Sequence, residues 1–155
     1  MEPIAESLSF YGSPSDCAAL PWSWVDHELS VAGTYWVVPR TTSAPHPRPV
    51  WGVWLDHQLL LSIGSAVVAR QLVDDPTTTV HLDSGTDVVI VEGLVEGESV
   101  APDAVAAYDQ KYDWSYTVDE YGPLTVVAPT VVLAWRSAGW AGRDGFQTAG
   151  RWRFT

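Results

Sequence analysis

Short runs of β-branched and aromatic residues, separated by turn residues, follow one another along the chain from residue 34. Such runs are typical of β-strands. The predicted strands cover residues 34–40, 50–55, 58–63, 77–82, 87–96, 124–135 and 146–154. Asp56-His57 falls where a two-residue turn would join the second and third strands into a hairpin, and residues 83–86 join the fourth and fifth. Pro129 is expected at an edge or a bulge, because proline cannot donate a ladder hydrogen bond.

Apolar residues at spacings of three and four predict three short helices. They cover about residues 22–32, 65–73 and 102–112. Residues 1–20 show no periodicity and are expected to form a flexible arm, whereas residues 21–155 are expected to form a single domain. Because hairpin-joined strands outnumber short helices, the pattern predicts a mainly β protein, an antiparallel barrel or sandwich.

Composition narrows the choice of partners. The 155-residue chain has 19 Asp and Glu against 8 Lys and Arg, a net charge of −11, and Lys111 is its only lysine. Such a surface repels nucleic acid and anionic membranes, so neither is expected as a partner. The chain also contains nine Trp, which are expected in the core, at an interface between copies, or lining a pocket for a flat ligand.

Searches for localisation and catalytic signals are mostly negative. No apolar run approaches the roughly 20 residues that span a bilayer, and residues 1–6 do not resemble a secretory signal, so a cytoplasmic location is expected by default. The lone Cys17 cannot form an internal disulfide, and the four His do not match a metal-binding signature, so no metal site is expected. No phosphate-binding glycine loop or nucleophile elbow is present, and the catalytic residues are left unknown.

A few polar residues are candidates for a site, each with a structural alternative. Glu92 lies mid-strand, where it either lines a pocket or faces solvent. Arg151 and Arg153 lie on one face of the last strand and can bind an anion or simply neutralise nearby carboxylates. His46 and His81 are the histidines considered for a ligand site, although a strand histidine such as His81 is more often structural.

The order of short motifs resembles the pyridoxamine 5′-phosphate oxidase-like split β-barrel family, including its actinobacterial branch that uses FMN or the deazaflavin coenzyme F-420. The matching stretches are Pro21-Trp22-Ser23-Trp24, Tyr35-Trp36, 40–46, 49–56, Ser62-Ile63-Gly64, 69–72, Asp75-Pro76, 88–93, Ala107-Tyr108, Lys111-Tyr112, 126–129 and 151–154. Together they cover nearly all of the chain from residue 21.

The resemblance implies an antiparallel split β-barrel that forms a homodimer, with two cofactor sites at the subunit interface and hydride transfer to or from a small organic substrate. It implies that the strand around residues 48–54 lies along the cofactor ring and that residues 62–70 hold its phosphate. The implied cofactor-binding residues are Arg48, Val50, Trp51, Ser62, Ser65, Arg70, Arg151 and Arg153. The implied substrate pocket contains His46, Trp54 and Trp152.

The chain departs from the family where flavin phosphate is usually bound. A Ser-Arg-Lys-Ala-Arg stretch there corresponds to Ala66-Val67-Val68-Ala69-Arg70, which lacks the serine hydroxyl and the first two cations. Arg70 and Ser65, one place earlier, remain, and Val53 stands where some relatives have another cation. Three hypotheses follow. The first is a flavin- or deazaflavin-dependent oxidoreductase. The second is a cofactor-free barrel that binds an apolar ligand in a Trp-lined pocket or converts it as an isomerase or cyclase. The third is a haem-binding protein with His46 or His81 as the axial ligand.

Overall fold

The computed structural model describes residues 2–10, 13–14, 20–137, 146 and 148–155; Cys17 lies outside them. Among these residues, nine of the eleven strands belong to one antiparallel sheet. The strands are β1 (Ile4–Ser7), β2 (Ser9–Phe10), β3 (Ser13–Pro14), β4 (Tyr35–Pro39), β5 (Arg48–Val50), β6 (Gly52–Leu55), β7 (Gln58–Leu61), β8 (Thr77–His81), β9 (Asp87–Ser99), β10 (Leu124–Arg136) and β11 (Gly150–Arg153). The helices are α1 (Trp22–Val31), α2 (Ala66–Asp74), α3 (Pro102–Tyr112) and α4 (Val118–Tyr121).

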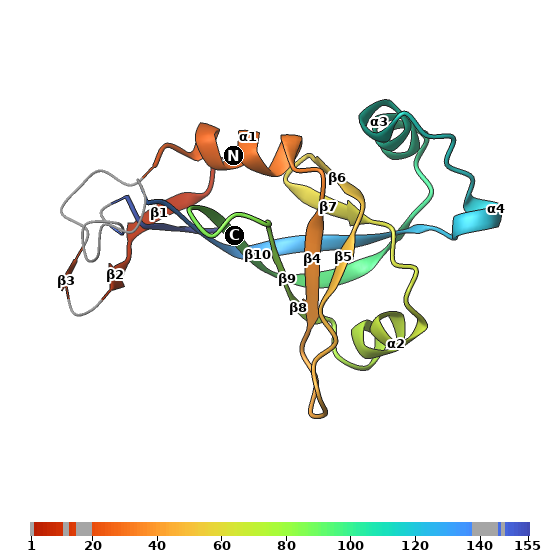
Figure 1. The fold of residues 1–155 in the computed structure, drawn as a ribbon, viewed down its shortest axis with the longest axis horizontal. Helices are drawn as coiled ribbons and strands as arrows, with labels where there is room; N and C mark the ends of the chain where they lie inside the picture. Colours follow the sequence, from red (N-terminus) through yellow and green to blue (C-terminus); the bar gives the residue numbers. More distant parts are fainter. Residues whose placement is uncertain (1, 11–12, 15–19, 138–145, 147) are drawn as a thin grey trace.

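The two longest strands, β9 and β10, run side by side through the middle of the molecule (Figure 1). The sheet continues from β10 through β11 to β1, and from β9 through β8 and β4 to β5. The pairing of β9 with β10 shifts register at Val126/Val127 and again at Pro129/Val131. The second shift confirms the predicted bulge at Pro129, where the ladder tolerates a residue without an N–H.

The β6–β7 hairpin closes the barrel, because β7 pairs with β10 as well as with β6. Its turn residues Asp56 and His57 have φ angles of 48° and 60°. Two successive left-handed residues match the right-handed twist of the flanking strands, and this confirms the predicted two-residue turn. The predicted hairpin of β8 and β9 is also present. The fold is therefore the predicted mainly β, antiparallel split barrel.

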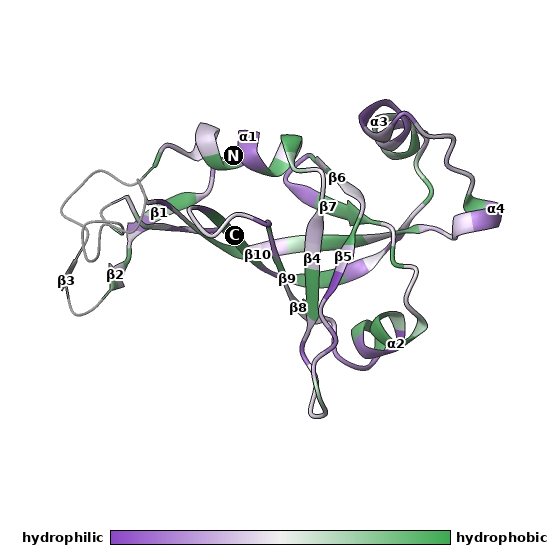
Figure 2. Cartoon of the chain, in the orientation of Figure 1, coloured by the Kyte–Doolittle hydropathy of each residue, from purple (hydrophilic) through white to green (hydrophobic). Residues whose placement is uncertain are grey.

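Helices lie around the sheet, with α1 and α2 on opposite sides of β4 in the view of Figure 1 and α3 beyond the β6–β7 hairpin. The main core cluster includes Val25 and Leu29 of α1 and Val68 and Leu72 of α2. A second cluster joins α3 to the hairpin through Ala104 and Tyr108. Figure 2 shows hydrophobic residues around much of α2, and two of them, Val67 and Val73, face solvent at 48% and 83% exposure.

Two segments differ from the expected pattern. Ile4–Ser7, expected in a flexible arm, instead pairs with β11 as the sheet edge. This pairing satisfies backbone groups that an edge strand would otherwise leave free, and Glu6 of β1 meets two arginines of β11. The short helix α4 was not expected, because four residues are too few to show a helical period. Within the described part of the chain, no helix is both long and apolar enough to cross a membrane.

Gly52 lies at the start of β6 with its backbone pressed against β7. A Cβ atom there would come within 2.6 Å of the Leu60 carbonyl oxygen and of a Leu61 methyl group. Gly52→Ala is therefore expected to lower the free energy of unfolding by about 1–3 kcal/mol, the usual cost of overpacking. Urea unfolding would measure it. Gly85→Ala is the control, because nothing lies within 4 Å of its Cβ position. Equal stability of the two variants would contradict this account of β6.

Candidate functional site

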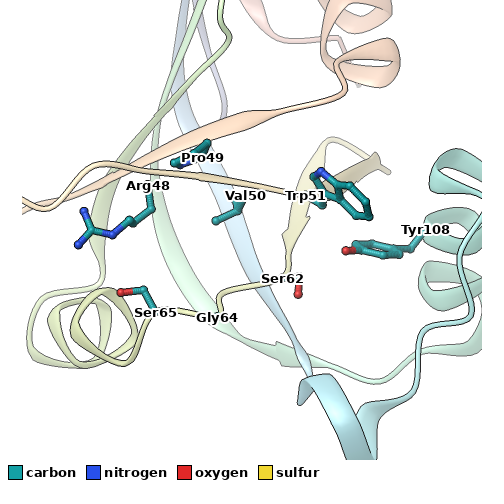
Figure 3. Close-up of a pocket in the computed structure, with 8 residues that line it drawn as sticks. All are labelled: Arg48, Pro49, Val50, Trp51, Ser62, Gly64, Ser65 and Tyr108. Carbon is teal, nitrogen blue, oxygen red and sulfur yellow. The ribbon is translucent and has the colours of Figure 1, made fainter.

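A groove of about 410 Å³ opens between β5, the β7–α2 turn and α3 (Figure 3). Arg48, Pro49 and Val50 of β5 form one wall and lead into Trp51. The turn from Ser62 to Ser65 lies opposite, and Tyr108 of α3 lies beside Trp51 at one end. The groove depends on the barrel closure, because β7 must end beside β10 for the turn after it to face β5.

The groove contains most of the cofactor-site residues that the sequence implied. It brings together Arg48, Val50, Trp51, Ser62 and Ser65. Arg70 lies on the exposed side of α2 and is not among the lining residues. The remaining two, Arg151 and Arg153, lie on β11, where Glu6 accepts from Arg153 Nε at 3.1 Å and lies 3.8 Å from Arg151 Nη1. These two arginines neutralise a carboxylate of the same chain and are not among the residues that line the groove.

One end of the groove suits an anion. The Arg48 side chain is exposed, and its Nη1 donates to the Pro47 carbonyl at 3.0 Å. Ser65 is the N-cap of α2 and accepts from the Val68 N–H at 3.4 Å. An α-helix leaves its first N–H groups without intrahelical partners and carries partial positive charge at this end. A cation, a hydroxyl and a helix N-terminus therefore meet at this end.

The other end is aromatic. The Trp51 ring stacks on Tyr112 with centroids 4.5 Å apart and an interplanar angle of 2°, and it meets Trp114 at 88°. Tyr108 contacts both Tyr112 and Tyr116, with ring centroids 4.9 Å apart in each case. Trp51 remains 42% exposed despite these contacts. This end therefore presents a large, partly uncovered indole face to a flat ligand.

Lys111 is a feature of the site that sequence reasoning assigned no role. Its Nζ donates to the Tyr35 hydroxyl at 2.8 Å and to the Gly52 carbonyl at 3.0 Å. Tyr112 adds a second link, because its hydroxyl accepts from the Gly52 N–H at 3.0 Å. Burial lowers the pKa of Lys111 to about 8. The only lysine of an acidic chain thus links α3 to Gly52, the residue after Trp51. The signal available in the sequence was that it is the only lysine.

The implied substrate-pocket residues lie elsewhere. Trp54 and Trp152 are 7% and 1% exposed and belong to the main core. Trp54 Nε1 donates to Asp26 at 2.8 Å, which satisfies the one polar group of the ring. Their size explains the placement, since burying a large ring stabilises the core more than lining a shallow groove would. His46 lies in the loop between β4 and β5 and is not among the lining residues.

The other polar candidates also lie outside the groove. Glu92 is exposed on β9, as its structural alternative proposed. His81 stacks on Trp36 with an interplanar angle of 4°, and its Nδ1 lies 2.9 Å from the Leu82 carbonyl oxygen. Within the described ranges, no group of three or more His, Cys, Asp or Glu residues is arranged to hold a metal ion.

Comparison with solved structures identifies proteins of the same fold. An F-420 reductase has 19% sequence identity to this chain and a TM-score of 0.57, and the match covers 69% of this chain and 94% of the reductase. An FAD-binding protein from Mesorhizobium loti has 12% sequence identity and a TM-score of 0.60, and the match covers 97% of this chain and 99% of that protein. A haem-binding protein from Mycobacterium smegmatis has 15% sequence identity and a TM-score of 0.58, and the match covers 84% of this chain and 62% of that protein. No family model and no curated protein matches the chain.

The pKa of Lys111 predicts how stability depends on pH. The folded-state pKa, about 8, lies below the ordinary 10.5, so the unfolded chain binds more protons between these values. Raising the pH through this window therefore favours the folded state. Relative to Lys111→Met, the wild type is expected to gain about 1 kcal/mol from about pH 7.5 to 9.5, less than full linkage because the amine is partly exposed.

Urea unfolding of the two proteins at several pH values would measure this gain. Burial raises the pKa of Tyr35 and Tyr112, which disfavours the folded state only above about pH 10, and both tyrosines are present in both proteins. Parallel stability curves for wild type and variant would show that Lys111 is not desolvated as described.

Proposed function

We propose that the chain binds a flavin or deazaflavin cofactor in the groove and acts as an oxidoreductase on a small organic substrate. The observation that carries the proposal is the groove itself, which joins a cationic end at Arg48 to an aromatic end at Trp51. A flavin-type cofactor has the matching shape, a flat ring system joined by a short chain to a phosphate. The solved structures support the choice, since two of them are described as an F-420 reductase and an FAD-binding protein.

The residues present fit such a cofactor, with fewer cations than the family pattern has. Arg48, the Ser65 hydroxyl and the free N–H groups of α2 would hold a phosphate. The two valines that replace family cations differ in position. Val68 is fully buried in the core, so it does not face the phosphate, whereas Val67 is 48% exposed and leaves that place open to water. An apolar side chain can desolvate a bound phosphate without pairing with it, and this cost concerns Val67 and not Val68.

The ring would lie along Val50 and Trp51, where apolar side chains exclude water from one face. A flavin or deazaflavin supplies hydride transfer when it is bound, and the protein supplies binding and orientation. Stacking on an indole and an electrostatic hold on a phosphate at the other end would fix the ring in one orientation. A substrate would then approach the face of the ring that the strand leaves open.

The charged end can be tested with two ligands that differ only in a phosphate. FMN is expected to bind more tightly than riboflavin, and Arg48→Ala is expected to weaken FMN about tenfold while leaving riboflavin unchanged, since one charge-assisted hydrogen bond is lost. Equilibrium dialysis against each ligand measures both affinities. F-420, which is also anionic, is titrated in parallel to identify the preferred ring.

Arg136→Ala is the matched control, because Arg136 pairs with Asp87 on the β9–β10 ladder and not with the groove. It should leave both affinities as in the wild type. Equal binding of FMN and riboflavin to the wild type would remove Arg48 from the site. Absence of binding by FMN, riboflavin and F-420 would overturn the proposal and favour the cofactor-free alternative.

The cofactor-free alternative has one observation in its favour. Ala66 and Val67 place no cation or hydroxyl in the first turn of α2, so Arg48 is the only charged side chain among the described residues that line the groove. Under this alternative the same Trp51 surface would bind an apolar or weakly polar ligand, and the riboflavin and FMN titrations would both be flat.

We further propose that the protein is a homodimer whose partner covers the aromatic end of the groove. Three ring side chains form a continuous exposed surface there. Trp114 contacts Trp51 at 5.8 Å and Tyr121 at 6.2 Å between ring centroids, and all three are 38–44% exposed. Clustered exposed aromatic residues are typical of interface centres. A partner seated there would also shield the groove from water.

Sedimentation velocity at several concentrations tests this dimer. Trp114→Glu is expected to shift the protein to the monomer, because a carboxylate at the centre of the contact would be desolvated without a partner. Ile4→Glu is the control, since Ile4 is 61% exposed on β1, and β1 lies at the opposite end of the molecule from α4 (Figure 1). A monomeric wild type, or a dimer unaffected by Trp114→Glu, would overturn this interface.

A further inference from the structure

The aromatic end of the groove also carries two hydroxyl groups whose role the cofactor proposal leaves open. Ser62 of the β7–α2 turn and Tyr108 of α3 both line it beside Trp51 (Figure 3). Tyr108 is only 4% exposed, yet it borders the groove. Burying a phenol against a ligand site requires a hydrogen-bond partner for its hydroxyl, so the arrangement raises the question of what this end binds.

The hydroxyls are neutral at physiological pH. Burial raises the pKa of Tyr108 to about 12 and raises that of Tyr116, while the Ser62 hydroxyl opposes the rise at both phenols. The Tyr116 hydroxyl donates to the Gly122 carbonyl at 2.6 Å. Ser62 has a single proton and faces two phenol oxygens, so it can act as a donor to only one of them at a time. When Ser62 donates its proton to the Tyr108 oxygen, the Tyr108 O–H is the donor of these three hydroxyls that can still bind an acceptor supplied by a ligand.

The surroundings define which acceptor fits. Trp51 is covered on one side by Tyr112, which leaves its other face for a second flat ring. The charged side chain among the described lining residues, Arg48, belongs to the opposite end of the groove (Figure 3). Neutral donors beside an indole favour a neutral oxygen on a conjugated ring over a carboxylate or phosphate. None of the described residues that line this end is a cation, and the nearby Lys111 amine already donates to Tyr35 and Gly52.

We propose that Trp51, Ser62 and Tyr108 form a subsite that binds a planar conjugated ring through its carbonyl oxygen, with the ring on the indole and the oxygen accepting from a hydroxyl. The inference rests on the proposed function in one respect, which is whether the bound ring belongs to a cofactor or to a substrate. A flavin-type cofactor has ring carbonyls, and so does a conjugated carbonyl substrate. The recognition chemistry is the same for both.

Two neutral probes of similar size isolate the oxygen. Coumarin is a bicyclic ring system with a carbonyl, and naphthalene is a bicyclic ring system without one. Tyr108→Phe is expected to weaken coumarin about tenfold and to leave naphthalene unchanged, because a single hydrogen bond is lost. Trp51→Leu is expected to weaken both probes, since stacking serves either ring. Equilibrium dialysis of the cofactor-free wild type and both variants against each probe gives the six affinities.

Tyr121→Phe is the matched control, because Tyr121 contacts the same aromatic cluster without lining the groove. Far-UV circular dichroism and urea unfolding verify that each variant is folded. Ser62→Ala gives a second variant, expected to weaken coumarin selectively. If neither Tyr108→Phe nor Ser62→Ala discriminates coumarin from naphthalene, or if coumarin does not bind, the subsite is overturned.

A third probe assigns the source of the ring. Lumiflavin carries the flavin ring and its carbonyls without a phosphate. Competition between lumiflavin and coumarin, together with weaker lumiflavin binding by Tyr108→Phe, would place the cofactor ring in the subsite. Unchanged coumarin binding in protein saturated with FMN would instead assign the subsite to the substrate. Coumarin and lumiflavin carry no phosphate, so their binding does not depend on Arg48. If Arg48→Ala leaves FMN binding unchanged, the anion-end assignment is overturned while the coumarin result still stands.

Discussion

The backbone N–H and carbonyl of Gly52 are the point at which the barrel, α3 and the groove are joined. Its carbonyl accepts from Lys111 and its N–H donates to the Tyr112 hydroxyl, each at 3.0 Å. Both side chains come from the end of α3, and the close approach of β6 to β7 leaves no room for a Cβ atom. The residue that precedes Gly52 is Trp51, and its ring stacks on that same Tyr112. The position of the indole in the groove thus follows from hydrogen bonds to its neighbour's backbone.

The Lys111 and Tyr112 hydrogen bonds to Gly52 require a desolvated charge, and this favours a functional role for the aromatic end of the groove that they support. Desolvating the Lys111 amine costs free energy, and two uncharged hydrogen-bonding side chains would hold α3 with a smaller desolvation penalty. The amine lies over the Tyr35 and Tyr112 rings, 4.7 and 5.3 Å from their centroids, so the aromatic groups that surround it also stabilise its charge. Tyr112, which stacks on Trp51, therefore also stabilises the charge of the half-buried lysine.

Local signals in the sequence predicted the local structure well and the site only in part. The Asp56-His57 turn, the Pro129 bulge and three helices depend on neighbouring residues, and the structure confirms them. Pairing of β1 with β11 joins residues about 150 positions apart, so no local period could show it. Lys111 was missed for the same reason, because its partners Tyr35 and Gly52 lie 76 and 59 residues away. Burial of Trp54 and Trp152 likewise depends on the closed barrel.

The position of Val68 shows why a motif must be interpreted through the fold. A sequence comparison counts Val67 and Val68 as two lost cations, yet Val68 packs in the core, where a lysine side chain would have to leave its amine desolvated. Only the outward-facing place of Val67 bears on an anion beside α2. The anion end therefore relies on Arg48, Ser65 and the helix terminus, and its hold on a phosphate is weaker than a three-cation site would give. With a weak charged end, the ring contacts at Trp51 and the neutral hydroxyls beside it must contribute more of the selectivity, because they remain for any flat ligand whether or not it carries a phosphate.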